Sequence, residues 1–269
     1  MNALVQQAFN SQRRGLAYFN IAWTLAQREL KGRYRGSWLG FLWTFAEPLI
    51  LTFIFFFIFV IVFRQDHPNY LLYLLGGMLP FFFLQNSVVK ATNSLLTYST
   101  LIRQIYCPRE VFVVVGILSE LYHFVLSLVV LAPFYFYYET LPTWRVVVVV
   151  PAILLVTLFA YGMGLFFASL NIFVRDTRIF INLLFRIWFY ITPIFYTVSR
   201  LPEASPTVHF LYNLNPLVPL FGVFRWALVP SEPLPEATFI VIMLLQVAFV
   251  SVAGVVFFAR NDNATVKLL

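Results

Sequence analysis

Long apolar stretches, separated by short polar segments, make up most of this chain. A helix needs about 20 mostly apolar residues to cross the hydrocarbon core of a bilayer. On this pattern we predict six transmembrane helices, at about residues 40–63, 70–96, 111–138, 146–173, 179–198 and 238–259. The expected fold is an all-α membrane protein with a single transmembrane domain over residues 1–269.

The segment before the first span, residues 18–38, has the pattern of a partly amphipathic helix. At helical spacing Phe19 and Trp23 share one face, while Arg28 and Lys31 lie on a roughly opposite one. Such a helix lies in the cytoplasmic interface, with basic side chains toward the headgroups. It is either an anchor for the first span or also a guide for an amphiphilic substrate. The candidates for substrate access are Arg28, Lys31, Arg33, Tyr34, Arg35 and Trp38.

Residues 201–236 are rich in proline, yet they contain the apolar piece 217–229. This piece is too short to span a bilayer, which takes about 20 residues. Irregular backbone at membrane depth is tolerated only where protein or water satisfies its polar groups. We therefore predict short re-entrant or interfacial helices before the last span. The alternative is a surface loop with one half-buried helix.

Composition agrees with a chain whose solvent is lipid. Hydrophobic residues make up 61% of the sequence, charged residues 11%, and the mean hydropathy is +0.84. Globular domains are about half apolar and about a quarter charged. A soluble fold of this length could not bury so much apolar surface.

The distribution of basic residues predicts the orientation. An even number of spans puts both termini on one side of the membrane. If that side is cytoplasmic, it holds twelve basic residues, namely Arg13, Arg14, Arg28, Lys31, Arg33, Arg35, Arg103, Arg109, Arg175, Arg178, Arg260 and Lys267. The other side holds four, namely Arg64, Arg145, Arg200 and Arg225. This positive-inside bias predicts cytoplasmic termini, and it explains the net charge of +7 without nucleic acid.

Few residues suggest chemistry within the chain. The single cysteine, Cys107, excludes an intrachain disulfide, and three widely spaced histidines argue against a metal cluster. The phosphate-binding pattern G-x-x-x-x-G-K-[ST] is missing from the sequence, so this chain cannot hydrolyse ATP by that route. The first 35 residues lack an uninterrupted apolar core, and we expect no removable signal peptide. No catalytic, cofactor-binding or metal site is predicted.

Four ionisable residues fall within predicted spans, where such groups are costly. Lys90 lies near the cytoplasmic end, where its side chain can extend to the interface. Glu120 and His123 share a helix face and can pair, meet a neighbouring helix or relay protons. Arg186 either pairs within the chain or faces a pore and holds a phosphate.

Several motifs occur in a recognisable order. Residues 33–43 read RYRGSWLGFLW and lead to Pro48 at the start of the first span. Further motifs are IYCPREV at 105–111, FVRDTR at 173–178, TPIFY at 192–196 and NPLVPLFGVFR at 215–225. Together they resemble the permease subunit of ABC-2-type polysaccharide exporters. The family has Asn before the proline, where this chain has Glu47.

The resemblance implies roles for two segments. Residues 97–110 would form a coupling helix that docks in a groove of an ATPase subunit; an ordinary cytoplasmic loop is the alternative. Its contact residues would be Leu101, Ile102, Arg103, Ile105, Tyr106 and Arg109. Residues 201–236 would form gate helices on the outer face.

The resemblance also implies a channel built from two protomers. Spans one and five of each would form its walls, with Trp43, Arg186, Tyr190, Phe195 and Tyr196 as candidate lining residues. Aromatic rings stack on sugars without demanding one stereochemistry, which suits a sliding polymer.

The expected function is export of lipid-linked polysaccharide, of O-antigen, capsule or teichoic acid type, across the bacterial cytoplasmic (inner) membrane. The expected partners are a second copy of the chain, two ATPase subunits that bind ATP and Mg, the glycan substrate and membrane lipids. One alternative is an ABC-2 exporter of a small amphiphile, such as a drug or lipid. Another is a membrane enzyme acting on lipids, but the 11 acidic residues are scattered.

Overall fold

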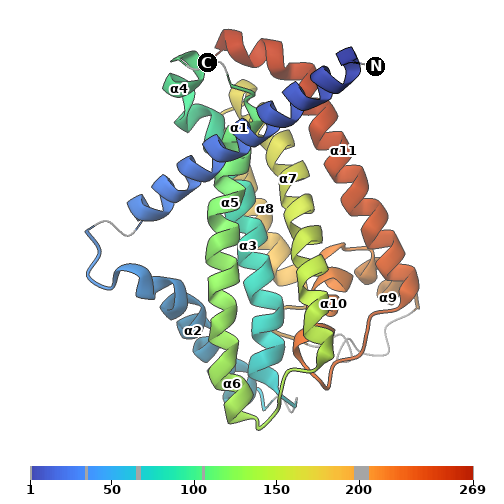
Figure 1. Ribbon diagram of the computed structural model, residues 1–269. Helices are drawn as coiled ribbons and strands as arrows, with labels where there is room; N and C mark the ends of the chain where they lie inside the picture. The colour runs from blue at the N-terminus through green and yellow to red at the C-terminus, as the bar shows by residue number, and fades with distance from the viewer. Residues whose placement is uncertain (1, 34–35, 65–67, 105–106, 197–205, 269) are drawn as a thin grey trace.

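The computed structural model describes residues 2–33, 36–64, 68–104, 107–196 and 206–268, and all the regular structure in these ranges is helical. The helices are α1 (Asn2–Arg33), α2 (Trp43–Phe56), α3 (Tyr70–Thr97), α4 (Ser99–Gln104), α5 (Glu110–Ser127), α6 (Ala132–Tyr137), α7 (Val149–Phe173), α8 (Thr177–Ile191), α9 (Pro206–Asn213), α10 (Leu217–Leu228) and α11 (Ala237–Leu268). Short 3-10 or π segments precede α2, α6 and α7 and follow α2. The prediction of an all-α protein is confirmed for these residues (Figure 1).

Among the described residues, five helical segments are long and apolar enough to cross a membrane, namely Gly40–Val62, Tyr70–Thr97, Glu110–Tyr137, Trp144–Phe173 and Ala237–Asp262. They coincide with five of the six predicted spans. The remaining span, predicted at 179–198, is shorter than expected, because α8 ends at Ile191. Its 15 residues extend about 22 Å, less than the roughly 30 Å of a bilayer core. Pro193 explains the early end, since a proline disfavours helical geometry in the residue before it, and Thr192 is extended.

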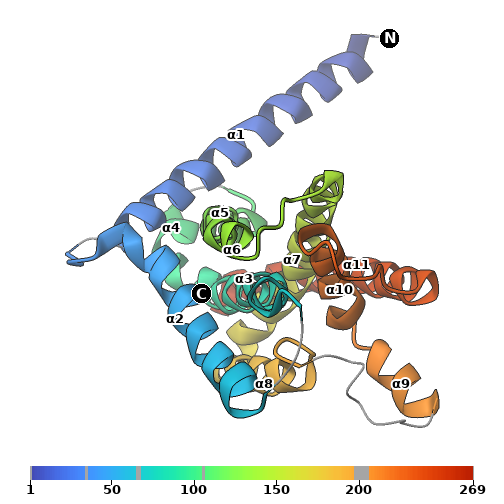
Figure 2. The ribbon, with the colours of Figure 1, turned by 90° about the horizontal axis from the view of Figure 1, so that it is seen from below.

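The N-terminal helix differs from its predicted bounds of 18–38 at both ends. It begins at Asn2 and ends at Arg33. Gly36 and Gly40 then adopt positive φ angles of 82° and 50°, which glycine tolerates, and the chain turns there into the first span. α1 crosses one end of the bundle at an angle to the spans, and its N-terminal part extends past the bundle (Figure 2).

α3 is the central helix of the bundle, with α2, α5, α7 and α8 around it (Figure 2). Within the chain 78% of its apolar stretch is buried, against only 11% for the first span, Gly40–Val62. The first span therefore leaves most of its surface for lipid or for another subunit.

α7 and α11 cross at very short range because both carry glycine at the crossing point. A Cβ atom on Gly254 would collide with the backbone oxygen of Gly162. Small residues at a crossing let two membrane helices approach closely, which is how such helices gain packing contacts in lipid.

The proline-rich segment contains two short helices, α9 and α10. Ten of the twelve residues of α10 are buried among the spans, so the alternative of one half-buried surface helix does not describe it. In α9 the side chains of residues 206–209 lie outside the described residues. α1, α4 and the C-terminal part of α11 all lie at the same end of the bundle, whereas α6, α9 and α10 lie toward the other end (Figure 1).

Candidate functional site

Charged side chains from three helices meet where the end of α1 crosses the bundle. The carboxylate of Glu120 on α5 lies 2.9 Å from Arg33 on α1 and 2.7 Å from Lys90 on α3. Lys90 also lies 3.4 Å from Glu29 on α1. These four residues form the charged cluster. Two carboxylates balance two cations, so the cluster is neutral as a whole.

Burial makes Glu120 the centre of the charged cluster. Its side chain is 4% exposed, whereas those of Arg33 and Lys90 are 37% and 34% exposed. A buried carboxylate without partners would carry a large desolvation cost, and two cations offset that cost here. Of the arrangements open to Glu120 on sequence grounds, the structure shows contact with neighbouring helices. His123 is buried one turn further along α5.

Two hydroxyl groups extend the charged cluster toward the loop that follows α3. Lys90 donates a hydrogen bond to Ser119 Oγ, which lies 3.0 Å from a carboxylate oxygen of Glu29. Tyr98 donates to the other oxygen of Glu29 at 2.6 Å. Burial and this hydrogen bond raise the pKa of Tyr98, which keeps the phenol protonated as the donor. Because Tyr98 immediately precedes α4, this bond joins α1 to the loop 97–110.

A polar pocket of about 440 Å³ lies beside the charged cluster. Its walls come from the end of α1, the start of the first span, α3 and α5. The lining residues are Arg33, Ser37, Trp43, Thr44, Glu47, Pro48, Leu79, Phe82, Phe83, Gln85, Asn86, Glu120, His123, Phe124 and Ser127. The pocket thus combines charged, amide and aromatic groups at the junction of the interfacial helix and the first span.

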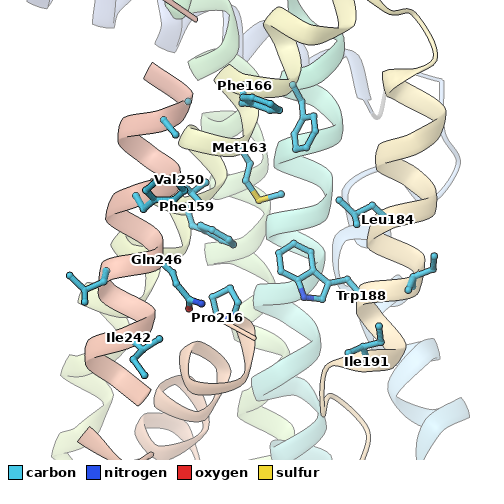
Figure 3. A pocket seen from close by; sticks show the side chains of 16 residues that line it. Phe159, Met163, Phe166, Leu184, Trp188, Ile191, Pro216, Ile242, Gln246 and Val250 are labelled. Carbon is cyan, nitrogen blue, oxygen red and sulfur yellow. The ribbon is translucent and has the colours of Figure 1, made fainter. Parts of the chain in front are cut away.

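A second pocket, of about 790 Å³, is almost wholly apolar and lies between α7, α8 and α11 (Figure 3). Phe159, Met163 and Trp188 project into it. Gln246 brings the main polar group, and its Nε2 donates to the backbone oxygen of Leu214 at 2.9 Å. We call this the apolar pocket.

Arg225 forms a second buried charged site, at the opposite end of α3. Its guanidinium donates to the backbone oxygens of Pro193 (2.6 Å), Ile194 (2.9 Å) and Tyr73 (3.1 Å), and to the Tyr73 hydroxyl (2.9 Å). It also lies 3.7 Å from the centre of the Tyr73 ring. A side chain at Gly77 would meet the guanidinium at 2.5 Å. We call this arrangement the arginine clamp.

Asn215, in the loop between α9 and α10, binds the end of α8 beside the arginine clamp. Its side chain accepts hydrogen bonds from Trp188 Nε1 and from the backbone N–H of Leu217, and it donates to Thr192 Oγ1 at 3.0 Å. The motifs TPIFY and NPLVPLFGVFR, noted separately in the sequence, therefore contact each other.

Aromatic rings gather beyond the end of α8. The ring of Phe195 lies 5.5 Å from Phe55 and 5.0 Å from Phe59 of the first span, and 6.1 Å from Tyr190. The Tyr196 hydroxyl donates to backbone oxygens near the end of α8. The first span and the end of α8 are thus in contact through aromatic side chains.

Comparison with known protein families now identifies the type of protein. The sequence profile of the family described as ABC-2 type transporter matches residues 21–229, well over half of the chain. This chain belongs to the ABC-2 type transporter family. The resemblance carried by the sequence motifs is confirmed, and the chain is a multi-pass membrane subunit of a transporter.

Three relatives of this ABC-2 chain share one name, O-antigen export system permease protein RfbA. The relative from Myxococcus xanthus is 30% identical over 247 residues, which cover 91% of this chain and 94% of the relative. One from Klebsiella pneumoniae is 31% identical over 208 residues, covering 77% and 79%. A second from that organism is 28% identical over 252 residues, covering 93% and 95%.

The residues predicted for substrate access take different positions in this ABC-2 chain. Arg28 and Lys31 are exposed on α1, and Trp38 is 98% exposed in the turn that follows. Arg33 is bound to Glu120 and lines the polar pocket. Tyr34 and Arg35 lie outside the described residues. The structure therefore brings only Arg33 of the described access residues to a pocket.

The residues predicted to contact an ATPase also differ in exposure and in their partners. Arg103 is exposed on α4, while Leu101 and Ile102 are half-buried against the chain's own core. Arg109 forms an ion pair with Asp262 near the end of α11 and donates to its backbone oxygen at 3.1 Å. Ile105 and Tyr106 lie outside the described residues.

The candidate channel residues fall into two groups. Tyr190, Phe195 and Tyr196 lie together near the end of α8, with Arg186 one turn before Tyr190 on an exposed face. Trp43 lies elsewhere, in the polar pocket.

Sequence reasoning assigned no functional role to two residues that the structure brings into prominence. On sequence grounds Arg225 is an outer basic residue and the last residue of the motif 215–225, although its charge inside the apolar stretch 217–228 is itself a signal. Glu47 departs from the family pattern in the sequence, and in the structure it lines the polar pocket.

Proposed function

We propose that this chain is the permease subunit of an ATP-driven exporter that moves lipid-linked polysaccharide across the bacterial cytoplasmic membrane. The observation that carries the proposal is similarity over nearly the whole chain to O-antigen export permeases. The site agrees with it, because an interfacial helix leads directly to a polar pocket. The O-antigen class of glycan is favoured over capsule or teichoic acid by the names of these relatives.

The functional unit in this proposal is a homodimer with both termini cytoplasmic. Arg186 supports it, because this cation shares an exposed face of α8 with Leu183, Ile187 and Tyr190. A cation facing lipid would be costly, whereas one facing a water-filled path between two protomers is not. The sparse burial of the first span leaves room for the second copy. α8 then completes a sixth crossing together with the non-helical residues after it, and α10 is the re-entrant helix of the outer gate.

The driving force in this proposal comes from two copies of a separate ATPase that binds ATP and Mg and docks on the loop 97–110. α4 lies at the same end as α1 and the C-terminal part of α11, which is the end we assign to the cytoplasm (Figure 1). The bond between Tyr98 and Glu29 gives this loop a direct connection to the interfacial helix. Movement of the loop would therefore move α1 as well.

Export of a small amphiphile is the second candidate, and the apolar pocket is the observation that favours it. Its volume of about 790 Å³ lies within the range of small-molecule sites, about 300–1,000 Å³. A polymer would not enter such a pocket, whose lining comes mainly from α7, α8 and α11 and does not include Tyr190, Phe195 or Tyr196.

Depletion of the protein in its native cell tests the proposed substrate. Lipid-linked glycan should accumulate at the inner leaflet while surface glycan is lost, and a plasmid copy of the chain should restore export. Normal surface glycan after depletion would refute the polysaccharide assignment. Loss of resistance to an amphiphile with unchanged surface glycan would favour the second candidate.

Co-purification tests the ATPase partner. Reversing an exposed charge on α4, in Arg103→Glu, should lower recovery of the ATPase about tenfold, because like charges across an interface oppose binding. Arg175→Glu is the matched control, since Arg175 is an exposed cation in the loop between α7 and α8. Equal recovery with both variants would show that α4 is not the docking site.

A further inference from the structure

We propose that the polar pocket binds a neutral, hydroxyl-rich sugar ring, namely the sugar closest to the lipid anchor of the substrate, and not the phosphate of that anchor. This inference rests on the proposed function, because it assumes that the substrate is a lipid-linked glycan. It adds a recognition site for the first sugar, located at the junction of α1 and the first span.

Among the residues that the structure describes, the charges around the polar pocket leave no unpaired cation for a phosphate. Arg33 is the one arginine or lysine among the described lining residues, and it is bound to Glu120 at 2.9 Å. Lys90 is not among the lining residues, and it forms ion pairs with Glu120 and Glu29. The charged cluster is therefore neutral by itself, and Glu47 adds a further negative charge to the lining. A phosphate in this pocket would meet an uncompensated carboxylate, which repels it.

Three polar side chains of the polar pocket are available for hydrogen bonds to a ligand. Glu47, Gln85 and Asn86 all line the pocket, and none of them forms a side-chain hydrogen bond or ion pair with the described part of the chain. A carboxylate accepts hydrogen bonds, and an amide both donates and accepts them. Hydroxyl groups, which also do both, complement this set better than any anion does.

Aromatic and apolar groups complete the match to a sugar ring. Trp43 is 44% exposed and lines the polar pocket together with Phe82. The C–H groups on one face of a sugar ring pack on such aromatic surfaces while its hydroxyls reach polar groups at the edge. A volume of about 440 Å³ lies within the range of small-molecule sites, about 300–1,000 Å³, and it accommodates a sugar unit but not a polymer. Recognition would therefore be limited to the start of the glycan.

A labelling experiment with the full-length protein in lipid nanodiscs tests the sugar site directly. In a Cys107→Ser background, Ser37→Cys places a reporter thiol in the lining of the polar pocket, and Gln27→Cys is an exposed control on α1. The rate of maleimide labelling is measured with farnesyl diphosphate, and with farnesyl diphosphate that carries one glucose or one N-acetylglucosamine. We expect a sugar-bearing probe to slow labelling of Ser37→Cys about tenfold, from a few hydrogen bonds, and to leave Gln27→Cys unchanged.

The role of Glu47 is tested in the same experiment. Adding Glu47→Leu should remove most of the protection, because a hydrogen bond to a charged group contributes about tenfold or more in affinity. Far-UV circular dichroism and recovery of the ATPase should be unchanged, which separates loss of the site from loss of the fold.

Three results would overturn the inference. Equal protection by farnesyl diphosphate without a sugar would make the polar pocket a phosphate or lipid site. Protection by none of the probes, or equal protection of the control cysteine, would remove the site. These outcomes are distinct from failure of the proposed function, which is read from surface glycan after depletion and does not depend on labelling.

Discussion

The two ends of α3 hold buried charge in different ways. Near its C-terminal end, Lys90 belongs to a cluster in which two carboxylates bind two cations. Near its N-terminal end, Tyr73 contacts Arg225 of α10; Tyr73 lies 17 residues before Lys90, about 25 Å along the helix. Arg225 is surrounded mainly by oxygens of backbone carbonyl groups. No carboxylate of the described residues lies within ion-pair distance of Arg225.

This difference shows what each site stabilises. The ion pairs of the charged cluster join three separate helices, so they fix the position of α1 relative to the spans. The arginine clamp instead donates hydrogen bonds to the carbonyl groups of Pro193 and Ile194. These residues follow the end of α8, so no N–H group of a continuing helix is there to bind their oxygens. The charged cluster connects helices, whereas the arginine clamp stabilises the non-helical backbone after the end of α8.

The largest effect on stability is expected for Arg225→Leu. The carbonyls of Pro193 and Ile194 would be left buried without this donor, at about 1–3 kcal/mol each, so we expect a loss of about 4 kcal/mol. The free energy of unfolding is measured by denaturant titration in detergent micelles. Arg145→Leu is the control, because Arg145 contacts Trp226 and, within the described part of the chain, makes one long hydrogen bond of 3.4 Å, to the backbone oxygen of Pro230. Equal stability of both variants would mean that the clamp contributes nothing.

A smaller loss, about 3 kcal/mol, is expected for Glu120→Gln. The change leaves Arg33 and Lys90 without their shared carboxylate. Breaking a buried ion pair costs about 3–5 kcal/mol, and partial exposure of the two cations places this one at the lower end. Glu47→Gln is the control, since Glu47 has no ion pair in the described chain. The free energy of unfolding is again measured by denaturant titration. A Glu120→Gln protein as stable as its control would contradict the proposed stabilising role of the charged cluster.

The smallest effect on stability, about 1 kcal/mol, is expected for Tyr98→Phe, which removes one hydrogen bond to Glu29. Its functional effect should be larger, because that bond links the loop 97–110 to α1. We expect ATP hydrolysis by the assembled transporter to continue while glycan export per ATP falls. Tyr122→Phe is the matched control on α5, where the ring is exposed. An unchanged ratio of export to hydrolysis would show that the link does not transmit movement.

The sequence predicted five of the spans well because each is a long apolar stretch bounded by polar residues. The span predicted at 179–198 extends past the end of α8, although Pro193 lies within it. Hydropathy measures how apolar a stretch is and does not indicate where a proline ends the helix. α1 was predicted to begin too late because residues 2–17 lack a clear apolar stripe.

The candidate site was harder to predict than the fold. Glu120, Lys90 and Arg33 each stood out in the sequence, yet their pairing depends on how α1 crosses α3 and α5. The arginine clamp depends on contact between residues 73, 193 and 225, which no local pattern connects. The position of Glu47 in the polar pocket depends on how α2, α3 and α5 pack together, which the sequence does not indicate.

Transport in reconstituted vesicles tests the central claim most directly. The purified chain is assembled with its ATPase in liposomes that carry lipid-linked glycan, and a glycosidase added outside reports how much glycan remains accessible. The account predicts that ATP makes the glycan progressively inaccessible when the ATPase faces outward, and that omitting the chain or the ATPase abolishes this change. Glycan that stays fully accessible with ATP and both subunits present would contradict it.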